Sequence, residues 1–267
     1  MSSALRQHHI NDLLFTLSPE EITRLSLSLE LLLLPPGLCL YEPGTPIQYA
    51  YFPTSAVISL LYEMDDGAMV EIAMVGNNGV VGVAAVLDGE STLSRAVVQN
   101  PGYAYRLAGE HLKREFQRGG PLQKTLLRYT QALLTEMAQT LVCVHHHSLE
   151  QQLCRWLLMR FDRLPINYLE LSQESIANLL GVRRAAISEI AVKLRKAGLI
   201  HYGRGRIALL DRPGMEKRAC GCYFIIRTEQ DRLLRKAKGL SLDEQPVVAS
   251  IDQASTIPAC SSFNSPS

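Results

Sequence analysis

Two kinds of hydrophobic pattern divide the front of the chain. Residues 8–34 carry apolar positions at helical spacing, and Ser18-Pro19-Glu20-Glu21 is typical of a helix start, so this stretch predicts helices. Residues 35–107 instead hold short β-branched and aromatic runs between Gly, Pro, Asn and Asp turn signals. That spacing predicts an antiparallel barrel or sandwich, whose interior holds one small ligand or is filled by its own side chains.

Helical periodicity returns after Gly119-Gly120. Residues 121–147 predict one long helix with an apolar stripe, and a second helix is expected over 148–163. The stripe either packs on its own domain or forms a two-helix seam with a second copy of the chain. Its members are Leu122, Leu126, Leu133, Met137, Leu141 and Val144.

Residues 171–211 have the order of elements of a winged helix-turn-helix. Ser172 is placed to cap a short helix, Gly181 allows a sharp turn, and a second helix starts near Arg183 or Arg184. Two short apolar runs around a basic, glycine-containing turn then predict a β-hairpin, the wing. The alternative is a small helical bundle with basic surface residues and no polyanionic partner.

The second helix has a predicted inward and outward face. With Ile187 and Leu194 inward, the outward residues near its N-terminus suit DNA base edges: arginine for guanine, glutamate for cytosine, serine for several bases and alanine for a thymine methyl. The expected base readers are Arg184, Ala185, Ser188 and Glu189. The expected phosphate contacts are Ser172, Gln173, Arg183, Lys193, Arg204 and Arg206.

The charge distribution supports a polyanionic partner for the same region. Residues 1–150 hold 9 Lys/Arg and 15 Asp/Glu, residues 151–238 hold 18 and 8, and residues 239–267 hold none and 3. A single basic segment on an otherwise acidic chain is the electrostatic pattern of nucleic-acid binding. The polar last segment, 239–267, predicts a disordered tail.

Together these motifs resemble the Crp/Fnr family of bacterial regulators. The resemblance covers residues 10–238 and rests on LYEPGTPIQYAYFPTSAVISLL, DGAMVEIAMVGNNGVVG, SLEQQLCRWLLMRFDR, LSQESIANLLGVRRAAISEIAVKL, GLIHYGRGRIALLDR and ACGCY. It implies an α+β fold with an N-terminal cyclic-nucleotide-binding-like antiparallel β-roll, a long dimerisation helix and a C-terminal winged helix-turn-helix. The expected domains are 1–120, 121–147, 148–238 and the tail.

The expected effector pocket departs from the family. In members that bind cyclic nucleotide, a Gly-Glu-Leu stretch supplies an acid for the ribose and a later arginine meets the phosphate. The matching residues here are Gly82, Val83 and Ala84, without the acid, followed by Arg95. We therefore expect no cyclic-nucleotide binding, and the effector is not identified by the sequence.

Cysteine and histidine predict no metal or cofactor. Only Cys39 lies near the N-terminus, where iron–sulfur members of the family carry several cysteines. Adjacent helical residues point about 100° apart, so His145, His146 and His147 cannot share one metal unless the helix ends. The spacing of Cys220 and Cys222 is narrower than in standard zinc sites, so both are expected to pack after the wing.

These observations predict a homodimeric, sequence-specific transcription regulator. Its expected partners are double-stranded DNA, a second copy of the chain and RNA polymerase. No apolar run is long enough for a membrane span and no signal-peptide pattern is present, so a cytoplasmic location is expected. The sequence contains no glycine-rich nucleotide-binding loop and no GxSxG or HExxH motif, so we do not expect an enzyme. Two alternatives remain: a redox or metal sensor acting through Cys and His, and a ligand-binding module with a protein partner.

Overall fold

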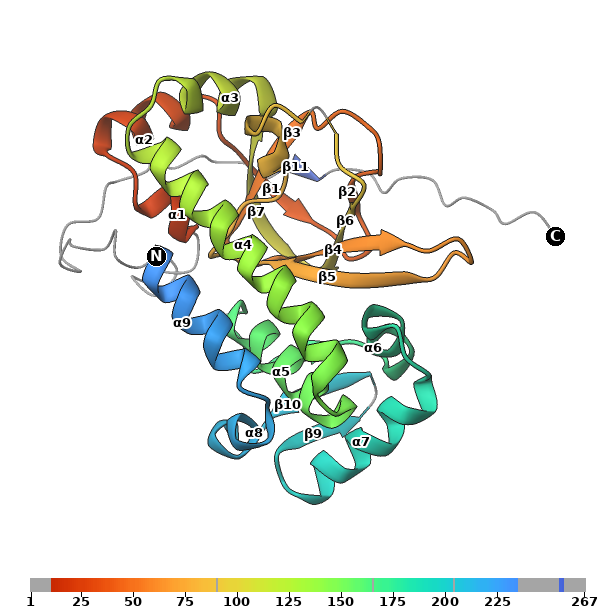
Figure 1. Cartoon of the computed structure of the whole chain (residues 1–267). Helices are drawn as coiled ribbons and strands as arrows, with labels where there is room; N and C mark the ends of the chain where they lie inside the picture. The colour runs from red at the N-terminus through yellow and green to blue at the C-terminus, as the bar shows by residue number, and fades with distance from the viewer. Residues whose placement is uncertain (1–10, 90, 165, 204, 235–254, 257–267) are drawn as a thin grey trace.

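The computed structural model describes residues 11–89, 91–164, 166–203 and 205–234, and the backbone of 255–256. A β-barrel lies above a smaller, mostly helical domain, and one long helix, α4 (Pro121–His146), runs from the first to the second (Figure 1). The predicted α+β class with antiparallel strands is confirmed.

Two short helices precede the barrel, α1 (Asp12–Phe15) and α2 (Pro19–Ser26). The predicted start of α2 is present as a capping box. The Glu21 backbone N–H donates to the Ser18 hydroxyl, and the Ser18 backbone N–H donates to the Glu21 carboxylate. Both ends of this turn are therefore fixed by local hydrogen bonds.

The prediction of helix over 8–34 is wrong at its end, and residues 8–10 lie outside the described residues. Glu30–Leu34 forms strand β1, which pairs antiparallel with β7 (Gly102–Ala108). A short leucine run carries no periodicity that separates a strand from a helix, so pairing with a distant strand decides its structure.

Two four-stranded sheets make the barrel, in the orders β11-β1-β7-β3 and β2-β6-β4-β5. The other strands are β2 (Cys39–Tyr41), β3 (Tyr49–Pro53), β4 (Val57–Glu63), β5 (Met69–Val75), β6 (Arg95–Asn100) and β11 (Ser255–Thr256). The pair β11–β1 is parallel, whereas the other pairs of these sheets are antiparallel. Apart from β11, the predicted tail over 239–267 lies outside the described residues.

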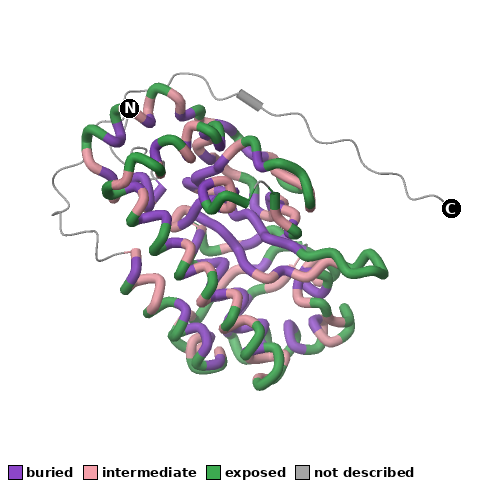
Figure 2. The backbone as a smooth tube through the Cα atoms, turned by 45° about the horizontal axis from the view of Figure 1, so that its top comes forward, coloured by how far each residue is buried: buried purple, intermediate pink, exposed green. Residues whose placement is uncertain are grey.

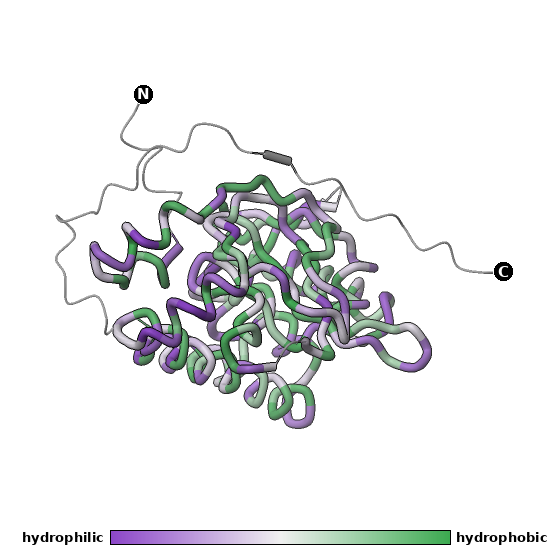
Figure 3. The backbone as a smooth tube through the Cα atoms, turned by 90° about the horizontal axis from the view of Figure 1, so that it is seen from above, coloured by the Kyte–Doolittle hydropathy of each residue, from purple (hydrophilic) through white to green (hydrophobic). Residues whose placement is uncertain are grey.

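Side chains from both sheets fill the barrel. Leu34 of β1, Ile58 of β4 and Val98 of β6 are fully buried in one apolar cluster, so the strands appear as buried segments in Figure 2. The tip of the β4–β5 hairpin is instead exposed, and Figure 3 shows the same loop as hydrophilic. Of the two sequence-based alternatives, this packing favours a barrel filled by its own side chains.

Helices connect the barrel to the second domain. The 3-10 helix η2 (Val83–Val86) lies against α3 (Gly109–Gln117), which follows β7. The helix predicted over 121–147 is α4, and the one predicted over 148–163 is α5 (Leu149–Asp162). In the described part of the chain, no helix combines the length and apolar character needed to cross a membrane.

The second domain has the predicted helix-turn-helix and hairpin. A three-stranded sheet in the order β8-β10-β9 packs beside the helices, with Ile176, Ile187 and Leu194 in a shared core. The elements of this part of the second domain are β8 (Tyr168–Glu170), α6 (Gln173–Leu180), α7 (Arg184–Lys196), β9 (Ile200–Gly203) and β10 (Arg206–Leu209).

Two further helices follow the hairpin, α8 (Arg212–Arg218) and α9 (Cys222–Leu234). The sequence pattern did not predict them. Helix α9 returns along α4 toward the barrel, so a segment from the end of the second domain covers one side of the long helix (Figure 1).

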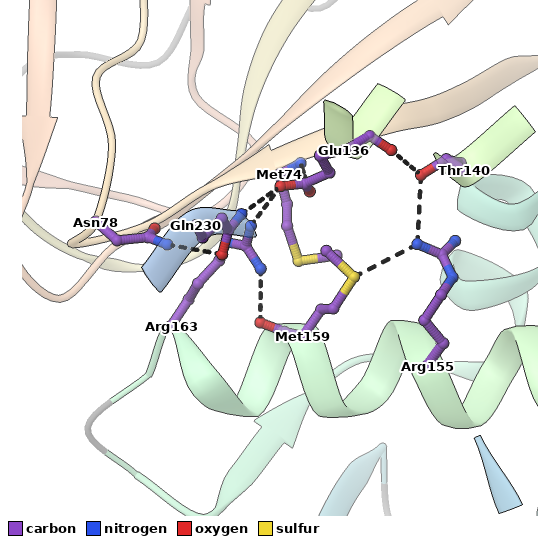
Figure 4. Close-up of polar contacts among 8 residues, drawn as sticks. All are labelled: Met74, Asn78, Glu136, Thr140, Arg155, Met159, Arg163 and Gln230. Atoms are coloured by element: carbon purple, nitrogen blue, oxygen red, sulfur yellow. Dashed lines mark hydrogen bonds and ion pairs between the residues drawn. The ribbon is translucent and has the colours of Figure 1, made fainter. Parts of the chain in front are cut away.

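Buried charged groups join the two domains. Arg160 of α5 pairs with Glu71 of β5 at 2.6 Å, and both side chains are essentially inaccessible to solvent. Arg163 pairs with Glu136 of α4 at 2.6 Å, and Gln230 of α9 donates to the same carboxylate (Figure 4). Because the buried charges of Arg160 and Arg163 depend on partners in the barrel and in α4, these contacts fix the orientation of the second domain on the rest of the chain.

Candidate nucleic-acid interface

The turn between α6 and α7 is built by local sequence. Ser172 caps α6 by accepting a hydrogen bond from the Ser175 backbone N–H at 3.0 Å. Gly181 ends the helix with φ +65°, a left-handed conformation in which side chains are strained. The chain then reverses within two residues, and α7 begins at Arg184. The predicted cap and turn are both present.

Helix α7 separates its two faces as the sequence predicts. Ile187 and Leu194 are fully buried against the domain core, whereas Arg184, Ala185 and Glu189 are exposed. The exposed residues lie in the N-terminal half of the helix, which is the half that enters a DNA major groove in helix-turn-helix proteins.

The hairpin after α7 extends this surface. Strands β9 and β10 pair antiparallel, and the turn between them contains Gly205 at φ +74°. Arg206 lies at the start of β10, where it pairs with Glu170 at 2.5 Å and covers the Tyr168 ring at 4.3 Å. An exposed arginine on this hairpin is suited to a phosphate contact beside the groove.

Short-range polar contacts hold the surface side chains. Lys193 pairs with Glu189 at 2.9 Å, which lowers the pKa of the Glu189 carboxyl, and Arg184 lies 3.7 Å from Glu174. The Ser188 hydroxyl donates to Gln173 Oε1 at 2.5 Å. Exposed ion pairs contribute little to stability, so DNA phosphates and bases can replace the partners in the Lys193–Glu189 and Arg184–Glu174 pairs at low cost.

The predicted DNA-contacting residues differ in accessibility. Ser188 and Gln173 are half-buried and joined to each other, and Arg204 lies outside the described residues. The exposed members are Arg184, Ala185, Glu189, Ser172, Arg183, Lys193 and Arg206.

Two family models match the chain over the two halves of this architecture. Residues 31–118 match a cyclic nucleotide-binding domain, and residues 151–218 match a Crp-like helix-turn-helix domain. The chain belongs to the Crp/Fnr family of transcription regulators. These matches do not favour the two alternatives, a redox or metal sensor acting through Cys and His and a ligand-binding module with a protein partner.

Relatives of this Crp/Fnr regulator include a global nitrogen regulator of Synechococcus elongatus, 21% identical over 66% of this chain and 83% of the relative. Among solved structures, FixK2 from Bradyrhizobium japonicum aligns with a TM-score of 0.63 at 16% identity, over 72% of this chain and 98% of that chain. The c-di-GMP responsive regulator CLP of Xanthomonas campestris gives 0.58 at 17% identity, over 73% and 100%. At these identities, the structures show a shared fold.

The predicted dimer seam on α4 is corrected at two positions. Leu122 and Leu126 are 2% and 1% exposed in the core of their own N-terminal domain, so they cannot face a second copy. Leu133 and Met137 are half-buried against the barrel, whereas Leu141 and Val144 are exposed. The predicted apolar stripe therefore packs mainly on its own domain. The exposed leucines Leu127 and Leu134 each follow a stripe residue by one position.

The predicted effector residues have different neighbours. Gly82 and Ala84 belong to the η2 region, which lies against β3 and α3, and Val83 is buried in the N-terminal core. Arg95 stands on the face of β6 opposite the core residue Ala96, paired with Glu42 at 2.5 Å and Glu63 at 3.5 Å. Its guanidinium is therefore already neutralised by carboxylates of its own domain.

The structure also gathers residues that sequence reasoning kept apart. Cys143 and His147 at the end of α4 lie beside Cys220 and Cys222 at the start of α9. The Cys143 and Cys220 sulfurs are 3.4 Å apart although the residues are 77 positions apart in sequence. Only the return of α9 along α4 brings them together, and no sequence signal predicted that return.

Proposed function

We propose that this Crp/Fnr regulator acts as a homodimer that reads a pseudo-palindromic DNA site through α7. The observation that carries the proposal is the exposed N-terminal half of α7, which begins at Arg184 directly after its N-cap Arg183 and is flanked by the cap of α6 and the β9–β10 hairpin. A two-fold dimer presents two such helices, and half-sites one DNA turn apart, about 34 Å, accommodate them. The proposal places the protein in the cytoplasm, acting on RNA polymerase at the bound promoter and without catalysis.

Base reading is assigned to the outward side chains of α7. Arg184 is proposed to donate to guanine O6 and N7, and Glu189 to accept from cytosine N4 once DNA phosphates draw Lys193 away. Ala185 is positioned for a thymine methyl, and Ser188 reads a base when its hydroxyl leaves Gln173. The proposed phosphate contacts are Ser172, Gln173, Arg183, Lys193, Arg204 and Arg206.

The proposed dimer seam is the stripe of α4 that remains exposed. Leu127, Leu134 and Leu141 are spaced seven residues apart and are 49%, 62% and 61% exposed. A heptad repeat of leucine is the pattern of a two-helix coiled coil, and such large exposed apolar residues are costly without a partner. Val144 continues the stripe toward the second domain.

Selection of bound sequences from random duplex DNA, at two salt concentrations and without added ligand, tests the proposal. A two-fold-symmetric site whose affinity falls with salt is expected. The proposal would be contradicted if binding were independent of sequence in all three conditions: without additions, with cyclic nucleotides and with cell extract.

Replacement of Arg184 by alanine is expected to weaken binding to the selected site by about 1–3 kcal/mol and to relax the preference at one base position per half-site. Fluorescence anisotropy with the selected duplex and its single-base variants measures both effects. Arg195→Ala is the matched control, because Arg195 is an exposed arginine in the last turn of the same helix. Equal weakening on every sequence would make Arg184 a phosphate contact instead.

Cyclic AMP and cyclic GMP are expected to leave DNA affinity and the melting temperature unchanged. The ribose hydroxyl would meet Val83 rather than an acid, and Arg95 is held by two carboxylates. Thermal melting and anisotropy over a range of nucleotide concentrations check this. A melting temperature that rises with nucleotide concentration would contradict it, because a ligand of the native state stabilises by mass action. Cyclic di-GMP is titrated in a separate experiment, since the similar regulator CLP responds to it.

A further inference from the structure

The junction between α4 and α9 is packed by cysteines rather than by aliphatic side chains. Cys143, Cys220 and Cys222 form a cluster of their own, apart from the three apolar cores, and are 0%, 3% and 2% exposed. His147 points its Nδ1 toward the same point, 3.5 Å from the Cys222 sulfur. The four candidate donor atoms all lie within 4.8 Å of one another.

We propose that Cys143, His147, Cys220 and Cys222 bind a structural Zn²⁺ ion that ties the end of the DNA-binding domain to the long helix α4. Three thiolates and an imidazole are an established zinc ligand set, and four protein ligands close the tetrahedron. With Zn–S and Zn–N bonds of about 2.3 and 2.0 Å, two sulfurs lie about 3.8 Å apart and a sulfur and a nitrogen about 3.5 Å apart. The distances of 3.4 Å from Cys143 to Cys220 and 3.5 Å from Cys222 to His147 are close to these values.

Local structure explains how each ligand reaches the site. Cys143 and His147 are four residues apart at the end of α4, so they share one helix face. The helix stops at His147, whose backbone is extended (φ −120°, ψ 151°), while His145 and His146 remain exposed. Only one histidine of the run therefore turns inward. Gly221 separates the two cysteines that precede and start α9.

The surroundings also suit a metal–thiolate centre. Gln139 donates from Nε2 to the Cys222 sulfur at 3.1 Å, the kind of outer hydrogen bond that orients a ligand.

Charge balance gives an independent reason for the ion. Arg155 is 4% exposed, and its polar contacts go to the Thr140 hydroxyl at 3.3 Å and the Met159 sulfur at 3.4 Å (Figure 4). Among the described residues, it forms no ion pair with a carboxylate. A buried guanidinium needs a compensating negative charge. Zn²⁺ with three thiolates and a neutral imidazole carries one net negative charge, which would supply it.

The position of the site defines its consequence. His147 is the last residue before Ser148, the cap of α5, so the ion would lie at the junction between the long helix and the DNA-binding domain. Cys220 and Cys222 belong to the segment that leaves that domain. A bound ion would therefore hold α4, α5 and α9 in one arrangement.

The experiment is zinc quantification on the full chain, purified without a histidine tag and under reducing conditions. We expect one zinc per chain in the wild type, and the same content in the control variants Cys39→Ser and His146→Ala. Loss of most of the zinc is expected in His147→Ala and in the double variant Cys220→Ser, Cys222→Ser. Zinc at wild-type content in both of these variants would overturn the proposal.

A second measurement on the wild type covers the case in which a variant fails to fold. Replacement of zinc by Co²⁺ is expected to give the visible absorption bands of a tetrahedral, thiolate-ligated ion, and chelation is expected to lower the melting temperature by at least about 5 °C. A reduced wild-type protein without zinc and without these bands would overturn the site, as would a Cys143–Cys220 disulfide in its place. Neither measurement depends on DNA binding, so a negative result would disprove the zinc site without disproving the proposed DNA-binding function.

Discussion

Replacing Arg160 by methionine is expected to lower the free energy of unfolding by about 3–5 kcal/mol. The substitution leaves the Glu71 carboxylate buried between the two domains without its cation. Removing one partner of a buried ion pair is among the most destabilising single changes, since the remaining charge has been taken out of water without compensation. Chemical denaturation followed by far-UV circular dichroism gives the difference in unfolding free energy.

The surroundings of Glu71 explain why the effect is large. Its carboxylate accepts hydrogen bonds from Trp156 Nε1 at 2.6 Å and from the Ser59 hydroxyl, in addition to the ion pair. The Arg160 guanidinium lies over the Trp156 ring at 4.2 Å and also donates to Asn100. Removing Arg160 therefore disturbs contacts in the barrel and in α5 together.

The matched control is Arg232→Met. Arg232 pairs with Glu229 at 2.6 Å on the surface of α9, and its side chain is 52% exposed. An exposed pair of this kind contributes little, so a change below about 1 kcal/mol is expected. The double variant Arg160→Met, Glu71→Leu should recover part of the loss, because it removes both charges. Equal losses for Arg160→Met and Arg232→Met would contradict the role given to the buried pair.

Local signals predicted the DNA-binding domain well. The Ser172 cap, the Gly181 turn and the inward positions Ile187 and Leu194 lie in one continuous segment, and each follows from backbone preference or helical periodicity. The outward face of α7 then follows by geometry. This is why the candidate DNA-contacting residues could be named before the structure was known.

Features that depend on distant pairing could not be predicted in this way. Glu30–Leu34 is a strand only because β7 lies beside it, and Glu71 is buried only because α5 packs on β5. The cysteine and histidine cluster joins segments separated by most of the second domain. In each case the sequence shows the residues but not the partner that determines their environment.

The long helix shows a different limit. The length and apolar stripe of α4 were predicted. The helix has apolar residues on three faces, however, and periodicity alone does not show which face contacts a second copy of the chain. The barrel takes Leu122 and Leu126, α9 covers the side that carries Cys143, and the heptad Leu127, Leu134 and Leu141 remains. Subtracting the faces that the protomer itself covers is what identifies the proposed seam.

Introducing glutamate at both Leu134 and Leu141 is expected to convert the dimer into a monomer and to weaken binding to the two-fold site by at least about 100-fold. Two leucines that are more than half exposed in the protomer would pack knobs-into-holes between two copies of α4. Four carboxylates brought together at such a seam repel one another and lose their hydration. Sedimentation equilibrium measures the mass, and anisotropy with the selected duplex measures the affinity.

The control for this change is Leu93→Glu. Leu93 is 73% exposed but lies in the loop before β6, so the same charge is added away from α4. This variant should stay dimeric and bind DNA as the wild type does. Circular dichroism should show folded protein for every variant, because the substituted leucines are largely exposed in the protomer. A Leu134→Glu, Leu141→Glu protein that remains dimeric would place the seam on another surface. Loss of the two-fold site without loss of half-site binding is the result that connects dimerisation through α4 to the reading of both half-sites by α7.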